Sequence, residues 1–154
     1  MNIRRAHEKD LPRILELNNI ESKWVGKKEI SFFQKYWNIP FFSIIEDSDK
    51  VVGFLMAMDD CTDYDSVNFL WFKNKFRKYY YIDRVIVDES MRGKGIASML
   101  YKELINNKGP VPLVAEVAIE PPNEGSVKFH DKVGFKEVGT LTSDGKKVRM
   151  YYLD

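Results

Sequence analysis

The apolar positions of the chain follow a helical period in several segments. Ile96, Leu100 and Leu104 recur four residues apart, which places them on one face of a helix. In an earlier segment, Asp10 is a favourable N-cap and Pro12 suits the first turn after it. The predicted helices span residues 8–20, 27–37, 93–107 and 123–133.

Runs rich in β-branched and aromatic residues predict the strands. A short connection, Ser48–Lys50, joins two of these runs as a tight hairpin, and Asp144-Gly145 is the turn signal of a second hairpin. The segment 61–80 is aromatic and polar without a clean period, and we interpret it as a long loop with room for a helical turn. The predicted strands span residues 2–6, 41–47, 51–59, 80–88, 111–119, 135–142 and 147–153.

This order of elements predicts a mixed α/β fold in a single domain, residues 1–154. The chain has 154 residues, 44% of them hydrophobic, which is enough for an ordinary domain with its own core. Residues 79–119 form one clear β-α-β unit, whose two strands are expected to be parallel with a right-handed crossover. The sequence shows no repeat, linker or low-complexity segment.

Charge and cysteine content narrow the class of protein. The 24 Lys and Arg residues nearly balance the 23 Asp and Glu residues, so no basic footprint for nucleic acid is present. Cys61 is the single cysteine, which fits a reducing compartment, and no Cys-His signature marks it as a nucleophile. The N-terminus lacks the apolar core of a signal peptide, and the apolar runs are too short to span a bilayer. We therefore expect a soluble, cytoplasmic protein without a membrane or nucleic-acid partner.

Two glycines and two cations, Arg92-Gly93-Lys94-Gly95, stand where a predicted strand passes into a predicted helix. A helix N-terminus carries unsatisfied N–H groups and about half a positive charge, and glycine lets an anion approach them. The pattern predicts a diphosphate site, with a merely tight connection as the alternative. A P-loop is excluded because no glycine lies five residues before Gly93, whereas a dinucleotide-binding turn is matched in part, as GxGxxS with Glu116 about twenty residues on.

A third pattern covers the same residues. Arg92-Gly93-Lys94-Gly95-Ile96-Ala97 satisfies [Q/R]-x-x-G-x-[G/A], which resembles the acetyl-CoA-binding motif of the GNAT (Gcn5-related N-acetyltransferase) superfamily. IDRVIVDESMRGKGIASMLYKEL resembles the strand, turn and helix of that motif, and VAEVAIEPPNEGSVKFHDKVGF resembles the segment that follows. Element order agrees over essentially the whole chain, as in a little-characterised branch of the superfamily. The resemblance implies a twisted, mostly antiparallel sheet with one parallel β-α-β unit and flanking helices.

The resemblance also implies that main-chain groups hold acetyl-CoA. The pantetheine arm is expected along the strand before the turn, where Val85 and Val87 carry it and the N–H near Ile86 holds the acetyl carbonyl. Asn123 and Ser126 are expected to hold this arm or to cap the helix that they begin. The diphosphate is expected on backbone N–H groups of the turn residues Arg92, Gly93, Lys94, Gly95, Ile96 and Ala97.

Attack of an amine on a thioester needs a base for the amine proton, and the departing thiolate gains from an acid. Glu116 is the favoured base, because a carboxylate inside an apolar strand matches a base position of some relatives; exposure or an ion pair is its alternative. Asp83 is the second candidate, with a pair to Arg84 as its alternative. His130 stands where relatives usually carry tyrosine, and we expect it to donate a proton to sulfur or to hydrogen-bond it, unless it is a surface or capping histidine.

The expected function is direct transfer of an acetyl group from acetyl-CoA to an amine, without a metal. Tyr64, Trp71 and Phe72 are candidates for lining an acceptor pocket, and a place in the core is their alternative. The acceptor is a small-molecule or peptide amine that the sequence does not name, and the C-terminal strands leave a homodimer open. A non-catalytic module that binds coenzyme A is the alternative function, and a dinucleotide-binding protein is the third.

Overall fold

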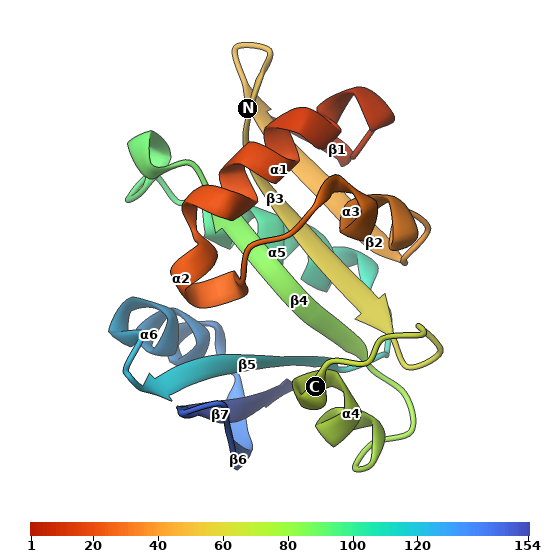
Figure 1. Cartoon of the computed structure of the whole chain (residues 1–154), viewed down its shortest axis with the longest axis vertical. Coiled ribbons are helices and arrows are strands. Elements are labelled where there is room, and N and C mark those ends of the chain that lie inside the picture. Colours follow the sequence, from red (N-terminus) through yellow and green to blue (C-terminus); the bar gives the residue numbers. More distant parts are fainter. The chain divides into compact units, whose positions relative to one another are not determined.

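The computed structural model in Figure 1 describes residues 1–21 and 24–154 in full and only the backbone of residues 22 and 23. The helices, of which η1 and η2 are short 3-10 helices, are η1 (Glu8–Asp10), α1 (Leu11–Ile20), α2 (Ser22–Val25), α3 (Ile30–Lys35), α4 (Val67–Lys73), η2 (Glu89–Met91), α5 (Ile96–Asn107) and α6 (Glu124–Val133). The strands are β1 (Asn2–Arg5), β2 (Phe41–Asp47), β3 (Lys50–Asp59), β4 (Tyr80–Val87), β5 (Leu113–Glu120), β6 (Lys136–Ser143) and β7 (Lys146–Leu153).

Contacts between residues divide the chain into two compact units. The first unit comprises residues 1–58 and 83–109, and the second comprises residues 59–82 and 110–154. Within the part of the chain that the structure describes, hydrogen bonds order seven strands as β1-β2-β3-β4-β5-β7-β6. The β4–β5 pair is parallel, whereas the β1–β2, β2–β3, β5–β7 and β6–β7 pairs are antiparallel. The predicted fold class, a mostly antiparallel sheet with one parallel β-α-β unit and flanking helices, is confirmed.

The first unit packs helices on both faces of its strands. Figure 1 shows α1 and α3 on one face of β2 and β3, with α5 on the other. Phe33 of α3 places its ring centroid 6.4 Å from that of Phe42 on β2 and 6.1 Å from that of Phe54 on β3. All three rings are buried, so this apolar contact stabilises α3 over the strands.

The second unit is built around β5 and the C-terminal hairpin. Tyr81 of β4 lies opposite Val114 of β5 in the parallel pair, and β7 runs antiparallel to both β5 and β6. Asp144 and Gly145 have φ angles of 52° and 73°, which is the geometry that a two-residue hairpin turn requires. The turn predicted at these two residues is thereby confirmed.

Helix α4 lies in the segment that the sequence pattern predicts to be a loop. Ser66 caps α4 by accepting a hydrogen bond from the backbone N–H of Phe69 at 3.5 Å. Apolar side chains lie on both the inner and the outer side of this helix: Phe69 is fully buried, whereas Leu70 is 40% exposed. Because such a distribution has no amphipathic period, the sequence predicted only a loop with room for a helical turn, whereas α4 covers the seven residues Val67–Lys73.

Other helices differ from prediction in their bounds. α5 begins at Ile96, three residues later than expected, because Gly93 and Gly95 have left-handed backbones that a helix does not accept. The helix predicted at 8–20 is divided into η1 and α1, and α3 is shorter than the helix predicted at 27–37. The assignment of the whole chain to a single domain stays a prediction, since its contacts group into two units.

Candidate functional site

The turn between η2 and α5 exposes its main chain. Gly93 and Gly95 have φ angles of 78° and 77°, and a Cβ atom added to either would meet no atom within 4 Å. Gly95 is the N-cap of α5, and no described side chain forms a capping hydrogen bond there. The N-terminus of α5 therefore has no side-chain cap among the described residues and an open approach at its glycines, which is the arrangement that binds a phosphate at a helix N-terminus.

Polar contacts from three elements fix the approach to this turn. Asp88, the residue after β4, accepts hydrogen bonds from the backbone N–H of Ser90 at 3.0 Å and from its hydroxyl at 2.9 Å. The backbone N–H of Asp88 donates to the carbonyl of Val52 on β3 at 2.8 Å. Arg13 of α1 forms an ion pair with Asp88 and donates to the carbonyl of Val51 at 3.1 Å. Arg13 and Asp88 thus position the turn, and the sequence motif does not contain Arg13.

The last residues of β4 lie close to β3 because β3 carries a glycine. A Cβ atom on Gly53 would be 2.9 Å from the carbonyl oxygen of Ile86 and 3.3 Å from the side chain of Ile96. Ile86 is 3% exposed, and its neighbours Val85 and Val87 are half-buried. Gly53 therefore lets β4 and the start of α5 pack tightly, and the predicted cofactor strand has its apolar side chains in or beside the core.

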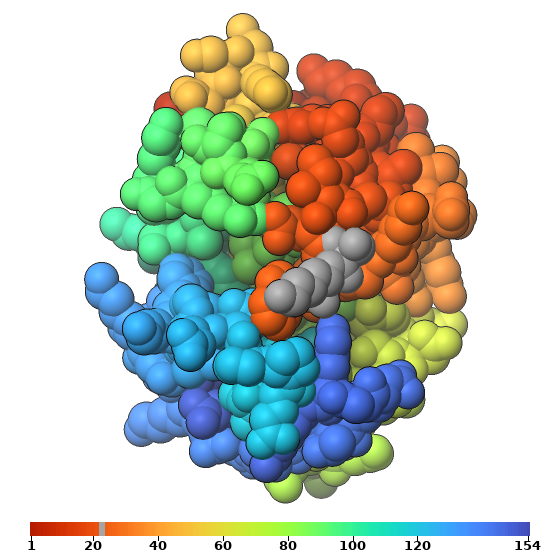
Figure 2. Space-filling model, turned by 60° about the vertical axis from the view of Figure 1, so that its left-hand side comes forward, coloured from red at the N-terminus to blue at the C-terminus, as the bar shows by residue number. Residues whose placement is uncertain are grey.

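The cations of the turn are not equally available. Arg92 forms an ion pair with Glu21 at the end of α1, within the first unit. Lys94 is exposed, with its Nζ atom 3.8 Å from the sulfur of Met91. Ile96 is buried and Ala97 is half-buried. Figure 2 shows the segment that carries the turn, in green, at the molecular surface beside α1, in red and orange.

Asp83 forms a buried ion pair. Its carboxylate accepts from Nε of Arg84 at 2.6 Å, and the two side chains are 4% and 3% exposed. The Arg84 guanidinium also donates to Oδ1 of Asn18 at 2.8 Å and lies 4.7 Å from the ring centroid of Phe32. The alternative given for Asp83, a pair with Arg84, is the arrangement in the structure.

Glu116 is half-buried in the second unit and is held by residues of two other elements. Its Oε1 atom accepts from the Tyr81 hydroxyl at 2.8 Å and from the Asn68 amide at 3.0 Å. Tyr81 lies on β4 and Asn68 lies on α4. No motif or periodicity links positions 68, 81 and 116, so neither donor could be predicted from the sequence.

His130 lies inside the second unit, with 4% of its surface exposed. Its Nδ1 atom is 2.8 Å from the backbone carbonyl of Ser126, so this nitrogen carries a proton and donates it to the carbonyl. Its ring stacks on Tyr151 with centroids 5.6 Å apart. Burial lowers the pKa of His130, an effect that the Ser126 carbonyl and Asp131 oppose in part. The neutral ring thus has its proton on the nitrogen that faces the helix, which weighs against a role as proton donor to sulfur.

Asn123 and Ser126 form the N-terminal cap of α6. The Asn123 side chain accepts a hydrogen bond from the backbone N–H of Ser126 at 3.4 Å. The Asn123 carbonyl also accepts from the N–H of Val127 at 3.0 Å. Of the two roles expected for these residues, helix capping is therefore present in the structure, and contact with a pantetheine arm stays a prediction.

The structure does not bring Glu116 and His130 together. Ala115 lies opposite Tyr151 on β7, and His130 of α6 stacks on that same Tyr151. Glu116 lies opposite Met150, and successive residues of a strand face opposite sides. Glu116 therefore points away from the face of the second unit on which α6 packs, toward the face that carries α4.

The three aromatic candidates for an acceptor pocket occupy different environments. Phe72 is fully buried, which is the core position named as its alternative. Trp71 packs on Gly139 of β6, where an added Cβ atom would be 2.6 Å from the indole ring. Tyr64 is half-buried, with its ring centroid 6.4 Å from that of Tyr81. Tyr64 and Phe72 both contact Tyr81 of the Glu116 cluster, but only Tyr64 of the two is outside the buried core.

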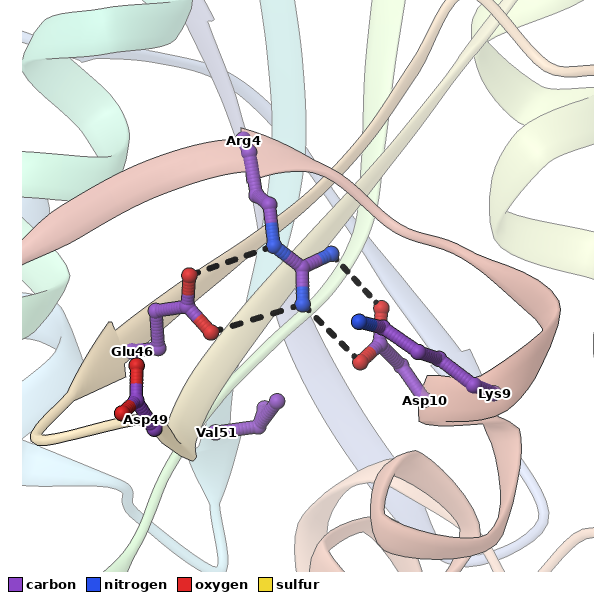
Figure 3. Close-up of a pocket in the computed structure, with 6 residues that line it drawn as sticks. All are labelled: Arg4, Lys9, Asp10, Glu46, Asp49 and Val51. Carbon is purple, nitrogen blue, oxygen red and sulfur yellow. Dashed lines mark hydrogen bonds and ion pairs between the residues drawn. The ribbon is translucent and has the colours of Figure 1, made fainter.

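A pocket of about 440 Å³ in the first unit is lined by charged side chains (Figure 3). The Arg4 guanidinium donates to Asp10 at 2.8 and 3.1 Å and to Glu46 at 3.3 and 3.4 Å. Burial acts to raise the pKa of Asp10, but hydrogen bonds from Arg4 and from the backbone N–H of His7 outweigh it and hold that pKa below its usual value. Arg4 thereby joins β1, β2 and η1, and we interpret the pocket as a structural ion cluster. Its lining residues are Arg4, Lys9, Asp10, Glu46, Asp49 and Val51.

A parallel β-α-β unit with a glycine turn at the helix N-terminus is the arrangement that binds phosphate groups in other mixed α/β proteins. A family model described as the acetyltransferase (GNAT) family matches residues 7–135, a range that includes the turn, Glu116 and His130. The chain therefore belongs to the acetyltransferase (GNAT) family, as its motif predicts. Among the helices of the described residues, none has the length and apolarity needed to cross a membrane.

Relatives and solved structures agree with this assignment. Phosphinothricin N-acetyltransferase of Streptomyces coelicolor is 36% identical over 69 residues, which are 44% of this chain and only 40% of that protein. The crystal structure of an N-acetyltransferase from Staphylococcus aureus Mu50 is 29% identical, with a TM-score of 0.73 over 99% of this chain and 97% of its own. The structure of yncA, a putative acetyltransferase from Salmonella typhimurium with its cofactor acetyl-CoA, has 19% identity and a TM-score of 0.75 over 100% of this chain and 93% of its own. Acetyl-CoA is the co-substrate of this family.

Proposed function

We propose that the chain is an N-acetyltransferase that moves the acetyl group of acetyl-CoA directly to an amine. The observation that carries this proposal is the turn at Gly93 and Gly95, which leaves the N-terminus of α5 uncovered in a chain of the acetyltransferase family. The turn N–H groups take the diphosphate, and the main chain of Val85, Ile86 and Val87 takes the pantetheine arm. Because these contacts are made by backbone, the side chains of β4 can remain in the core.

Glu116 is the base of this proposal. The acceptor ammonium loses one proton to Glu116, its nitrogen lone pair forms a bond to the acetyl carbon, and the carbon–sulfur bond breaks. The second proton of the nitrogen ends on the thiolate of coenzyme A, and the first passes from Glu116 to solvent. Glu116 is favoured over Asp83 because Asp83 is already paired with buried Arg84. His130 keeps its packing position on Tyr151 in this scheme.

The acceptor is a small-molecule or peptide amine, reached on the α4 face of the second unit, which carries Glu116, Asn68 and Tyr64. Phosphinothricin belongs in a first panel because a relative acts on it. A cytoplasmic location belongs to the same proposal. A homodimer also belongs to it.

The test combines binding with turnover. Calorimetry with acetyl-CoA and with NADH should show binding of acetyl-CoA alone, and thiol release from acetyl-CoA should rise when the correct amine is added. Binding of NADH without binding of acetyl-CoA would overturn the cofactor assignment. Tight acetyl-CoA binding with no thiol release over amino acids, polyamines, peptides and phosphinothricin would favour the alternative, a module that only binds coenzyme A.

A further inference from the structure

Glu116 receives two hydrogen bonds on a single carboxylate oxygen. The Tyr81 hydroxyl lies 2.8 Å from Oε1 and the Asn68 amide nitrogen lies 3.0 Å from the same atom. Toward an ionised carboxylate, a hydroxyl and an amide N–H act only as donors. Hydrogen bonds to a charged acceptor are stronger than those between neutral groups, and they favour the charged form of the acceptor. Both hydrogen bonds therefore favour the ionised carboxylate, against the burial of its other oxygen, Oε2.

The two donors are themselves held in place by one packed helix. Tyr81 is 1% exposed, and its ring centroid lies 5.5 Å from that of Phe69 and 5.8 Å from that of Phe72, both on α4. Asn68 stands in the first turn of the same helix, just after the Ser66 cap. Since α4 supplies the amide donor and packs the phenol donor, its position fixes the geometry of both hydrogen bonds.

The side chains beside Glu116 on its face of the sheet are apolar. Met150 lies opposite Glu116 on β7, and Val114 and Ala118 share its face along β5. None of these three side chains titrates. The charged residue of α4, Lys73, is exposed in the last turn of the helix, away from Asn68. The Tyr81 hydroxyl and the Asn68 amide both donate hydrogen bonds to Oε1 of this carboxylate.

We propose that Tyr81 and Asn68 are positioning residues that hold Glu116 ionised and in one orientation for taking the proton of the acceptor amine. This inference rests on the proposed function, in which Glu116 is the base. Neither residue touches acetyl-CoA in the proposed scheme, so their loss should slow proton transfer and leave cofactor binding unchanged. This separates a positioning role from a general weakening of the fold.

Tyr81→Phe is the main test variant, because it removes the hydroxyl and keeps the ring in the aromatic cluster. Loss of one charged hydrogen bond should lower kcat about tenfold at neutral pH and move the acidic limb of the kcat/KM profile upward by about one pH unit. KM for acetyl-CoA should not change. Tyr79→Phe is a matched control: Tyr79 is also fully buried beside Phe69, and its hydroxyl has no hydrogen-bond partner among the described residues. The control should behave as the wild type.

A second variant tests the proposal outside the aromatic core that surrounds Tyr81, and a double variant tests it in a Glu116→Gln background. Asn68→Ala removes a half-buried side chain outside that core and should move the same limb upward, while Asn68→Gln should restore part of the rate. In a Glu116→Gln background, Tyr81→Phe should cause no further loss of kcat. An acidic limb that stays in place in both Tyr81→Phe and Asn68→Ala overturns the proposal, as does a Tyr81→Phe loss that simply adds to that of Glu116→Gln.

A readout without turnover separates this inference from the proposed function. If the wild-type chain transfers no acetyl group to any amine, the proposed function fails. Carbon-13 NMR of labelled glutamate carboxyl groups, assigned with Glu116→Gln, still tests the two donors. The Glu116 signal should titrate at higher pH in Tyr81→Phe and at the wild-type pH in Tyr79→Phe. An unmoved midpoint in Tyr81→Phe means that the hydroxyl does not stabilise the carboxylate.

Discussion

In the proposed reaction, the first unit contributes main-chain groups and the second unit contributes side chains. In the first unit the turn at Gly93 and Gly95 offers main-chain N–H groups, Arg92 is paired with Glu21, and Lys94 is an exposed cation of the turn. In the second unit the Glu116 cluster consists of side chains from three elements. A main-chain site depends on backbone conformation alone, whereas a side-chain site depends on each neighbour that holds it. We therefore expect the main-chain site to be sensitive to substitutions that block the turn. We expect the side-chain site to be sensitive to substitutions that remove a hydrogen-bond donor.

Blocking the turn should have the largest effect. Gly95→Glu places a carboxylate where the diphosphate is expected, and juxtaposed like charges cost several kcal/mol, so Kd for acetyl-CoA should rise about 1,000-fold. Gly109→Glu is the matched control, because Gly109 also has a positive φ, 61°, with no atom within 4 Å of a Cβ position, but lies beyond the other end of α5. Calorimetry checks both variants. Equal losses in the two would mean that backbone strain, and not the anion site, explains the effect.

Removing the base should have the next largest effect, this time on rate. Glu116→Gln keeps the shape of the side chain and removes the negative charge, so kcat should fall about 100-fold with little change in Kd for acetyl-CoA. Glu120→Gln makes the same change on an exposed residue of the same strand and serves as the control. Steady-state kinetics with the identified acceptor measure the difference. A Glu116→Gln enzyme with wild-type kcat would assign proton transfer to another group.

The contrast between main chain and side chain also explains which parts the sequence predicts. The turn could be predicted from the sequence because its glycines and cations, the end of a strand and the start of a helix lie within a few consecutive residues. The Glu116 cluster joins residues 35 and 48 positions apart from it, through the parallel register of Tyr81 and Val114 and through α4. No local pattern carries this information, and α4 itself has no amphipathic period. Glu116 could be proposed from its unusual place in an apolar strand, but Tyr81 and Asn68 needed the fold.

The burial of polar side chains is a second property that the sequence pattern does not show. Asp83 and His130 have suitable chemistry, but only their surroundings show how that chemistry is used. Asp83 is committed to Arg84, and His130 donates to the carbonyl of Ser126. Arg13 and Gly53, which position the turn, have no place in its motif although they contact its flanks. The sequence therefore predicts residue types for a reaction better than it predicts their partners.

A smaller effect is expected from Arg92, a cation of the turn. A small effect would support the view that main-chain groups dominate this binding site. Arg92 is half exposed and paired with Glu21, so its charge is partly neutralised before any anion binds. Arg92→Ala should raise Kd for acetyl-CoA about threefold, the scale of an exposed ion pair. Glu21→Gln should have the opposite sign and lower Kd slightly. A loss in Arg92→Ala as large as that in Gly95→Glu would show that the side chain, and not the backbone, dominates the site.

The smallest effect on rate is expected at His130, which tests whether the α6 face belongs to the side-chain site. Because His130 packs against Tyr151, we expect kcat to change little in His130→Gln. If His130 donated a proton to sulfur, its loss would lower kcat strongly. The substitution should act on stability and on its pH dependence. Burial lowers the pKa of His130, so the unfolded chain binds the proton more readily than the folded one.

Stability is then fully present above the unfolded pKa of about 6.5 and falls as pH drops below it, until the lower folded pKa is reached. The free energy of unfolding, measured by urea denaturation between pH 7.5 and pH 5, should therefore fall in the wild type with a slope of at most about 1.4 kcal/mol per pH unit from this residue. His130→Gln should be less stable at pH 7.5 but should lose this slope. His7→Gln removes an exposed histidine and should keep the slope. A His130→Gln protein with the wild-type slope and a tenfold lower kcat would return His130 to the chemistry and place it with Glu116 among the side chains that act.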